Sequence, residues 1–575
     1  MIFRRSLFWV VAALVCLLTA ASILGQNTPS IRAAPADRTV NGDNDKKDEK
    51  KATPPKTDAE KKAPTTDEQL AALADKLSKM EQIVDTQQQK IDSLQKQLSF
   101  AATGVVPDSG TREYIGTPPS QKPVRRDDTP LTIRLGPKTT ITPVGMVDFT
   151  AVFRSTNTTG VAATPFGGIA FNNTIQGHIS ETRLHAQNSR FGLRFDTDVK
   201  DAHVIGYFET DFAGNNPANL FVSANGSTNR VRQFWVDYRR NRFELVGGQT
   251  WSLMTPNRDG AGPLNDNVFV TLNNDQAYQV GLPWARQAGL RFIYHANDNL
   301  QLAVALENPQ QFVGAGEVIF PFAFNAQLGP QFDAANQPGV PNMLPDVIGK
   351  IAYDSHGSHH YHIEGGGFMR GFREVFLPVG GTSFAHNTKM GGGGFASFNL
   401  EASKRFHLIG TMYGSAGGGR YLGGLGPDVV IMPIQIDPVS FTTKLSLVKS
   451  YSGLFGFEAK VNDKFTLDGY YGAAYFQKNA FQDVTSPLVT KPFIGFGGPN
   501  SPNSANRLVN EPTVGFTYTA WQDPQYGAFQ WVWQGSYVER QPWFVAAGAP
   551  KNAHNFMSIL SMRYVLPGKP PVDDK

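Results

Sequence analysis

The sequence of 575 residues contains one cysteine, Cys16, which lies in an apolar stretch near the N-terminus. Disulfide bonds therefore cannot hold the rest of the chain together. No later segment reaches the roughly 18 consecutive apolar residues that a transmembrane helix needs. An excess of one charge sign is also missing, because 53 Lys and Arg residues stand against 49 Asp and Glu residues. Proteins that bind nucleic acids usually carry a concentrated basic surface, so we expect no nucleic-acid partner.

Motifs of known catalytic chemistry are absent as well. The sequence has no G-x-S-x-G and no HExxH, and its glycine clusters at 391–394 and 417–426 lack the Lys-Ser/Thr ending of a phosphate-binding loop. Four histidines occur in the segment 355–362 (SHGSHHYH), with only Asp354 and Glu364 as nearby acidic residues. This segment is more typical of a solvated turn than of a metal site. We therefore expect no enzyme activity, no metal site and no cofactor.

The N-terminal region has the features of an exported protein. Two arginines precede an apolar run that ends at Leu18, and small residues follow from Ala20. This pattern predicts a secretory signal peptide over residues 1–25. Residues 26–66 are rich in Pro, Ala, Asp and Lys and have too few apolar side chains for a core, which predicts a disordered tether.

Residues 67–100 carry the strongest helical pattern in the chain. Their apolar residues are spaced alternately by three and four positions, which predicts a coiled coil and self-association. The core positions are Leu70, Leu73, Leu77, Met80, Val84, Gln87, Ile91, Leu94 and Leu98. Only Gln87 interrupts the apolar seam, and one polar core residue can fix register and oligomer number. The mixed core residues do not decide between two and three helices, and a lone amphipathic helix is the alternative.

After a Pro- and Gly-containing linker at 101–140, the pattern changes to period two. In the run that begins at Ser189, the phenylalanines and leucine lie on one face and the charged residues on the other. Sixteen candidate strands share this character between residues 141 and 567. Their approximate spans are 144–154, 188–199, 203–213, 230–239, 242–250, 286–295, 299–307, 347–354, 360–371, 392–402, 405–415, 450–462, 464–477, 511–520, 526–539 and 552–566.

The connections between these strands alternate between short turns and long loops. Lys200 and Asp201 form one short turn, whereas residues 155–187, 251–285 and 308–346 form long connections. This order is typical of outer-membrane β-barrels, in which the periplasmic turns are tight and the outer loops are long. We therefore predict an all-β transmembrane barrel of about 16 antiparallel strands over 141–567. Its apolar face should contact lipid and its charged face should line the interior, with a short tail at 568–575.

Four short motifs resemble those of a known family: SRFGLR at 189–194, YFETDF at 207–212, GQTWS at 248–252 and RYVLP at 563–567. With the heptads, they resemble the trimeric outer-membrane porins, particularly the DcaP-like group. The resemblance implies a sixteen-stranded barrel in outer-membrane lipid, assembled as a homotrimer, with the coiled coil in the periplasm. One feature departs from the family, because the chain does not end on the aromatic residue with which many barrels finish.

The hairpin around Lys200 predicts which wall charges lie side by side. Arg190 should lie opposite Asp211, and Arg194 opposite Tyr207 and diagonal to Glu209. In general porins the third long loop folds into the barrel, and acidic residues on it face arginines on the wall. The resemblance thus implies a constriction built from Arg190, Arg194, Glu209, Asp211, Arg232, Arg258, Asp259, Asp266, Asp275 and Arg286. The alternatives are an ion-pair ladder that stiffens the wall and a loop that only covers the mouth.

These observations favour a porin with a water-filled channel for passive diffusion of small hydrophilic solutes. An arginine-rich wall would favour anionic solutes, but loop carboxylates would oppose this, so the ion preference stays open. The Lys-rich tether beside a periplasmic coiled coil makes peptidoglycan a candidate partner. Two other functions compete with the channel. One is a non-channel outer-membrane barrel that acts as an adhesin or surface scaffold, and the other is a membrane-embedded hydrolase.

Overall fold

The computed structural model describes residues 131–567, except 159, 215–226, 315, 333–341, 343 and 358. The predicted signal peptide, tether, coiled coil and C-terminal tail lie outside these residues, as does most of the linker. Within the described residues, no helix is both long and apolar enough to cross a membrane.

Sixteen antiparallel strands form one closed sheet, as the sequence predicts. Each strand pairs with the next along the chain, and β22 closes the barrel on β2 with Met146 opposite Val565. The strands are β2 (Thr139–Arg154), β4 (Arg190–Val199), β5 (Ala202–Asp211), β6 (Arg230–Arg240), β7 (Phe243–Trp251), β8 (Arg286–His295), β9 (Leu300–Glu307), β10 (Asp346–His356), β11 (His360–Phe376), β12 (Ala385–Ser403), β13 (Phe406–Ala416), β16 (Lys449–Asn462), β17 (Phe465–Phe476), β20 (Asn506–Asp523), β21 (Gly527–Pro542) and β22 (Ala553–Val565). Closure matters because an open sheet edge would expose unpaired backbone groups.

Several strands extend beyond their predicted spans. The largest difference is at β12, which begins at Ala385 rather than at 392, because it continues to pair with β11 as far as Phe376. Glycines at 391–394 hide the alternation there. Similarly, β20 begins at Asn506 and β2 at Thr139. Backbone pairing with a neighbour sustains these ends where the side-chain pattern is weak.

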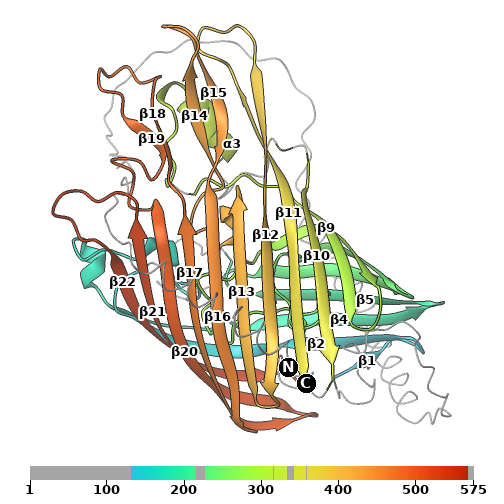
Figure 1. Ribbon diagram of the computed structural model, residues 1–575. Coiled ribbons are helices and arrows are strands. Elements are labelled where there is room, and N and C mark those ends of the chain that lie inside the picture. The colour runs from blue at the N-terminus through green and yellow to red at the C-terminus, as the bar shows by residue number, and fades with distance from the viewer. Residues whose placement is uncertain are drawn as a thin grey trace, which may run out of the picture. The chain divides into compact units, whose positions relative to one another are not determined.

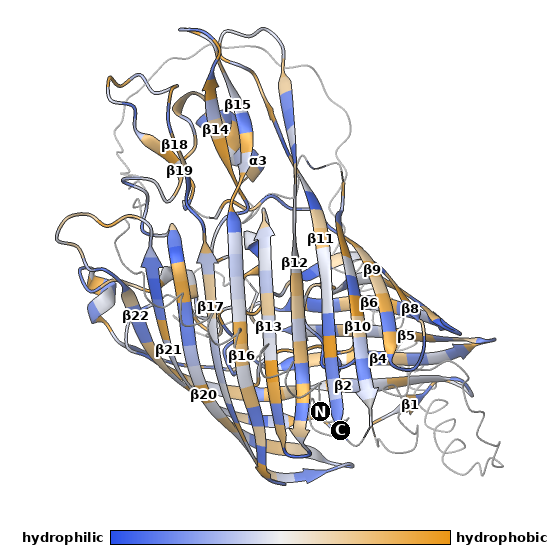
Figure 2. Ribbon diagram, in the orientation of Figure 1, coloured by the Kyte–Doolittle hydropathy of each residue, from blue (hydrophilic) through white to orange (hydrophobic). Residues whose placement is uncertain are grey.

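The side chains of the barrel wall are distributed in the way predicted for a membrane barrel. On β4, Phe191, Leu193 and Phe195 are exposed on the outer face. Charged side chains such as Arg370 and Asp211 are buried on the inner face. Hydrophobic and hydrophilic residues alternate along the strands in Figure 2. A soluble protein buries its apolar face, so this inverted distribution matches a barrel whose outside contacts hydrocarbon.

The short turns lie where the sequence predicts them. Lys200 and Asp201 connect β4 to β5, and Asn241 and Arg242 connect β6 to β7. Lys200 and Asn241 have φ angles of 57° and 51°, in the left-handed region that tight hairpin turns use. The long loops start from the opposite ends of these strands, so the two ends of the barrel differ in structure.

The long loops contain elements that the sequence analysis did not predict. They form two small hairpins, short helices and an extra strand that extends the main sheet. These elements are η2 (Phe166–Gly168), η3 (Ile175–His178), β3 (Glu181–His185), η4 (Phe322–Phe324), α3 (Asn325–Phe332), η5 (Gly419–Tyr421), β14 (Val429–Gln435), β15 (Phe441–Leu447), β18 (Asn479–Gln482) and β19 (Phe493–Phe496). Outside the loops, the short strand β1 (Ile133–Arg134) precedes β2 and pairs with it. The two hairpins and α3 gather beyond the ends of the barrel strands in Figure 1, where Phe324, Val430 and Phe496 share an apolar core.

Candidate functional site

The loop 251–285 runs through the interior of the barrel. Its backbone amides donate hydrogen bonds to inward-facing side chains of strands far apart around the wall. These bonds join Leu253 to Glu307 of β9 (2.7 Å), Asn257 to Glu364 of β11 (3.1 Å), Val280 to Glu511 of β20 (2.9 Å) and Asn274 to Gln534 of β21 (2.8 Å). A loop that covered only the mouth could not reach acceptors on all of these strands. The loop therefore folds into the barrel, as the resemblance implies.

The wall leaves room for the loop at particular glycines. A Cβ atom on Gly472 of β17 would collide with the carbonyl oxygen of Val280. Likewise, a Cβ on Gly281 would collide with the carbonyl oxygen of Gly453 of β16. Because glycine has no Cβ, the loop backbone can lie directly against the wall at these two strands.

A buried cluster on β5 and β6 centres on Arg232. Its guanidinium donates to Glu209 Oε1 at 2.5 Å, to Asp211 Oδ2 at 2.8 Å and to the Tyr278 hydroxyl of the loop at 3.0 Å. A β-bulge explains its position. Gln233 lies opposite Glu209 and Val231 opposite Thr210, so Arg232 is the extra residue. Bulges commonly re-aim side chains in this way, and here the bulge turns Arg232 inward.

Three further arginines lie around this cluster, and their side chains are more exposed to solvent than that of Arg232. Arg230 pairs with Asp211 at 2.7 Å while its side chain stays 36% exposed. Arg190 lies opposite Asp211, which confirms the predicted register, and is half-buried. Arg286 is also half-buried and lies over the rings of Trp251 and Trp284, 5.3 and 5.6 Å from their centroids.

The carboxylates of the same cluster are buried. Glu209 is 4% exposed and Asp211 is fully covered. The two carboxylates are thus held behind the arginines with which they pair. Among the side chains that form ion pairs in this cluster, the ones that stay partly exposed are therefore cationic, whereas the exposed carboxylate of Asp266 lies on the loop beside Asn265.

Arg194 lies opposite Tyr207, as predicted, but makes a different ion pair from the one expected. It binds Asp196 of its own strand with distances of 2.8 and 2.9 Å. Glu209 instead accepts hydrogen bonds from Arg232, Tyr207 and Asn265. Residues two apart on a strand share a face, so Asp196 is the nearer partner. Arg194 is therefore separate from the Arg232 cluster.

The charged residues of the loop have several different surroundings. Arg258 pairs with Glu458 of β16 at 2.7 and 2.8 Å, so at this position the loop supplies the cation and the wall the carboxylate. Asp275 is buried and accepts from the backbone amides of Thr164 and Ala277 at 3.0 and 2.8 Å. Such contacts fix the loop rather than expose its charge. Asp266 is exposed.

The interpretation of segment 355–362 as a solvated turn is correct for His359, which is exposed, but wrong for His362. His362 is fully buried, with its ring nitrogens 2.7 Å from Asp354 Oδ1 and 3.2 Å from Glu364 Oε2. The strand β11 already begins at His360, and period-two alternation then turns His360 and His362 inward. His362 and His360 lie two and four residues before Glu364, so the alternation along the strand would have predicted that all three side chains face the barrel interior.

Sequence reasoning missed other parts of the interior. Arg230, Tyr278 and the two tryptophans around Arg286 were not predicted, because only the folded loop brings them to β5 and β6. It also missed a second buried ion cluster, in which Arg370 of β11 lies 3.2 Å from Asp346 and 2.9 Å from Asp428. Arg370 lies on the inward-facing register of β11, which was the available signal.

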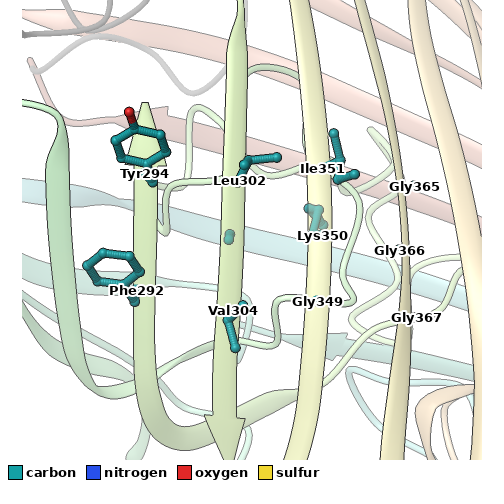
Figure 3. A pocket seen from close by; sticks show the side chains of 11 residues that line it. Phe292, Tyr294, Leu302, Val304, Gly349, Lys350, Ile351, Gly365, Gly366 and Gly367 are labelled. Carbon is teal, nitrogen blue, oxygen red and sulfur yellow. The ribbon is translucent and has the colours of Figure 1, made fainter. Parts of the chain in front are cut away.

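An apolar hollow of about 720 Å³ lies on the outer face of the barrel, away from these charges. Figure 3 shows Phe292 of β8, Leu302 and Val304 of β9 and Ile351 of β10 beside three glycines of β11. Most of its lining is apolar and faces lipid, and Tyr294 and Lys350 alone among its lining residues carry polar side-chain groups, so the hollow is poorly suited to orient a hydrophilic solute. We therefore place the candidate functional site inside the barrel.

No family model matches the chain, and no curated protein matches it. Solved structures of outer-membrane proteins do match. DcaP, an outer-membrane channel of Acinetobacter baumannii, is 16% identical, and the match covers 74% of this chain and 98% of DcaP with a TM-score of 0.49. OmpT of Vibrio cholerae, in a trimer form, is 10% identical over 75% of this chain and 100% of its own, with a TM-score of 0.39. OmpF of Salmonella typhi, in complex with daunomycin, is 8% identical over 76% of this chain and 100% of its own, also with a TM-score of 0.39.

Proposed function

We propose that the protein is an outer-membrane porin whose water-filled channel passes small hydrophilic solutes by passive diffusion and favours anionic ones. Closure of the sheet, an apolar exterior and a charged interior support the channel. The observation that carries the ion preference is the difference in burial within one cluster. Arg190, Arg230 and Arg286 are half-buried, whereas Glu209 and Asp211 are buried.

A passing anion would exchange part of its hydration shell for guanidinium groups. Arg286 suits this role because two tryptophans hold its guanidinium and no carboxylate of the described residues forms an ion pair with it. Arg230 shares its charge with Asp211 but keeps an exposed side. Guanidinium groups bind carboxylates and phosphates through parallel hydrogen bonds, so solutes with such groups fit this wall.

The ten residues predicted for the constriction divide into three sets under this proposal. Arg190 and Arg286 would contact solutes, with Arg230 added to them. Arg232, Glu209, Asp211, Arg258 and Asp275 would hold the loop and the wall in place. Arg194 and Asp259 lie outside the Arg232 cluster, and Asp266 is an exposed loop residue beside Asn265; we assign these three no contact with the solute.

We also propose how the protein assembles and which cell-envelope components it contacts. The heptads at 67–100 support self-association through a coiled coil, and the resemblance to trimeric porins favours a homotrimer with this coil in the periplasm. The Lys-rich segment 26–66 supports contact with peptidoglycan. Outer-membrane lipid would surround the exposed phenylalanines and leucines of the barrel.

Planar-bilayer recording tests the channel directly. Purified protein should insert and give discrete conductance steps, and in a KCl gradient the reversal potential should indicate preference for chloride. Arg286→Glu should shift that potential toward cation preference, because it replaces a half-buried cation by an anion. Arg405→Glu is the matched control, since Arg405 is exposed in the short turn between β12 and β13. Insertion without conductance steps would overturn the channel, and equal shifts in both variants would remove Arg286 from the pathway.

A surface-binding function is the second candidate, and one observation favours it. The long loops expose large apolar side chains, among them Ile436, Val439 and Val489. Exposed apolar groups can mark a surface that binds another protein. A non-conducting barrel whose loops bind partner cells or proteins would fit this candidate. The same bilayer recording separates it from the porin.

A further inference from the structure

Three side chains from three separate segments meet inside the barrel, outside the Arg232 cluster. They are Asp259 of the loop 251–285, Asp354 of β10 and His360 of β11. One carboxylate oxygen of each aspartate and a ring nitrogen of the histidine lie within 4.8 Å of one another. His360 Nε2 and Asp354 Oδ1 are 3.5 Å apart. The two strands are neighbours, and their connecting turn is short (Figure 1), so the group lies at the short-turn end of the barrel.

Neighbouring groups hold Asp354 in place. Its Oδ1 atom lies 2.7 Å from His362 Nδ1, and its Oδ2 atom accepts the backbone N–H of Gly260 at 3.0 Å. Gly260 directly follows Asp259, so this hydrogen bond also brings the loop carboxylate toward β10. His362 is in turn fixed by Glu364. Ligands of metal ions are commonly oriented by such an outer layer of hydrogen bonds.

The backbone of His360 is fixed in a similar way. Its N–H donates to Glu401 Oε2 of β12 at 3.0 Å. Its side chain is 18% exposed, whereas Asp354 is 2% exposed. The group is therefore reachable from solvent on the histidine side and enclosed on the aspartate side.

We propose that Asp259, Asp354 and His360 bind one divalent cation of the zinc class, and that this ion fastens the loop to the wall. Two ligand atoms about 2.1 Å from a tetrahedral zinc ion lie about 3.4 Å apart, close to the separation of His360 from Asp354. One imidazole with two carboxylates suits zinc and its neighbours, whereas Ca²⁺ and Mg²⁺ prefer oxygen ligands alone and more of them. The formal charge of two carboxylates also matches that of the ion.

Such an ion would restrain the loop on the side of the interior that faces β10 and β11. On another side, Arg258 already ties the loop to Glu458 of β16. Asp259 is the next residue, so ion binding would fix this part of the loop from two directions. The ion would bind and restrain the loop whether or not the barrel conducts.

Isothermal titration of the purified full-length protein with zinc chloride tests the proposal. We expect one ion per chain with micromolar or tighter affinity. His360→Gln and Asp259→Asn should each weaken binding by about tenfold or more, because each removes one ligand. His359→Gln is the matched control, since His359 is an exposed histidine next to His360. Asp259→Asn lies in the loop and leaves the strands unchanged, so it remains informative if the strand variant does not fold.

Three outcomes would overturn the proposal. One is the absence of saturable binding at micromolar zinc. Another is an equal loss of affinity in the His359 variant, which would indicate adventitious binding by surface histidines. The third is displacement of zinc by millimolar Mg²⁺ or Ca²⁺, which would contradict the assigned class of ion. One-to-one binding that is lost in both ligand variants and retained in the control would support the site.

Discussion

Replacement of Arg232 by methionine should strongly destabilise the barrel. Arg232 is 1% exposed and satisfies Glu209 and Asp211 together. Methionine keeps much of the apolar volume but leaves these two buried carboxylates without their shared cation. Breaking a buried pair by removing one partner typically costs about 3–5 kcal/mol. Arg230 still pairs with Asp211 in the variant, so we expect a value near the lower end, about 3 kcal/mol.

Arg230→Met provides the matched comparison. Arg230 lies on the same strand and pairs with the same Asp211, but its side chain is 36% exposed. Solvent screens such a pair, so its removal should cost about 0–1 kcal/mol. A double variant, Arg232→Met with Glu209→Gln, should recover part of the lost stability. It removes the negative charge of Glu209, which has no partner once Arg232 is replaced.

Urea unfolding of the barrel refolded into phospholipid vesicles, followed by tryptophan fluorescence, measures these free energies. Burial is the variable that the two single variants isolate. Equal losses for Arg230→Met and Arg232→Met would refute the reasoning, as would a loss below about 1 kcal/mol for Arg232→Met. An unchanged stability of the double variant relative to Arg232→Met would show that Glu209 is not the source of the cost.

Three further predictions test other parts of the molecule. Gly472→Ala should push the loop off β17, lowering stability and altering single-channel conductance, whereas Gly349→Ala, where a Cβ meets nothing within 4 Å, should change neither. Burial raises the pKa of Glu317 in the long loop after β9 well above its ordinary value, and the charge of Arg540 opposes this only in part. The folded state therefore keeps the proton and loses stability as pH rises above about 4.5, so Glu317→Gln should unfold at a higher temperature than the natural chain at pH 7 but not at pH 4. Removal of residues 66–99 should weaken the oligomer in cross-linking and native electrophoresis while the barrel still forms, and failure of the barrel would contradict an accessory role for the coiled coil.

Period-two alternation predicted the strands of the barrel wall, and the order of short turns and long loops predicted that they form a barrel. The alternation located all sixteen strands, and the turn at Lys200 then fixed the pairing of Arg190 with Asp211. The reason is physical, since a wall with lipid on one side and polar groups on the other must alternate along every strand. Where glycines replace side chains, as at the start of β12, this signal disappears and the boundary is missed.

The arrangement of the interior could be predicted only in part. The resemblance indicated that loop 251–285 enters the barrel, but not which wall residues it contacts. Arg232 points inward because of a bulge, and nothing in the local sequence marks a bulge without a glycine. Arg258 meets Glu458, which lies 200 positions away in the chain. Such pairings depend on the path of the loop through the barrel, so residue spacing alone cannot predict them.

The wall charges were predicted either to brace the barrel or to contact solutes, and burial separates the two roles residue by residue. Arg232 gives its donors to Glu209, Asp211 and Tyr278, so we infer that it braces the wall. Arg286 rests on two tryptophans and is half-buried, so we infer that it meets solutes. Arg286→Gln should then lower chloride preference with little change in stability, whereas Arg232→Met should change stability far more. The contrary result would be that Arg286→Gln and Arg232→Met each lower chloride preference and stability by similar amounts. Bracing and solute selection would then reside in the same residues.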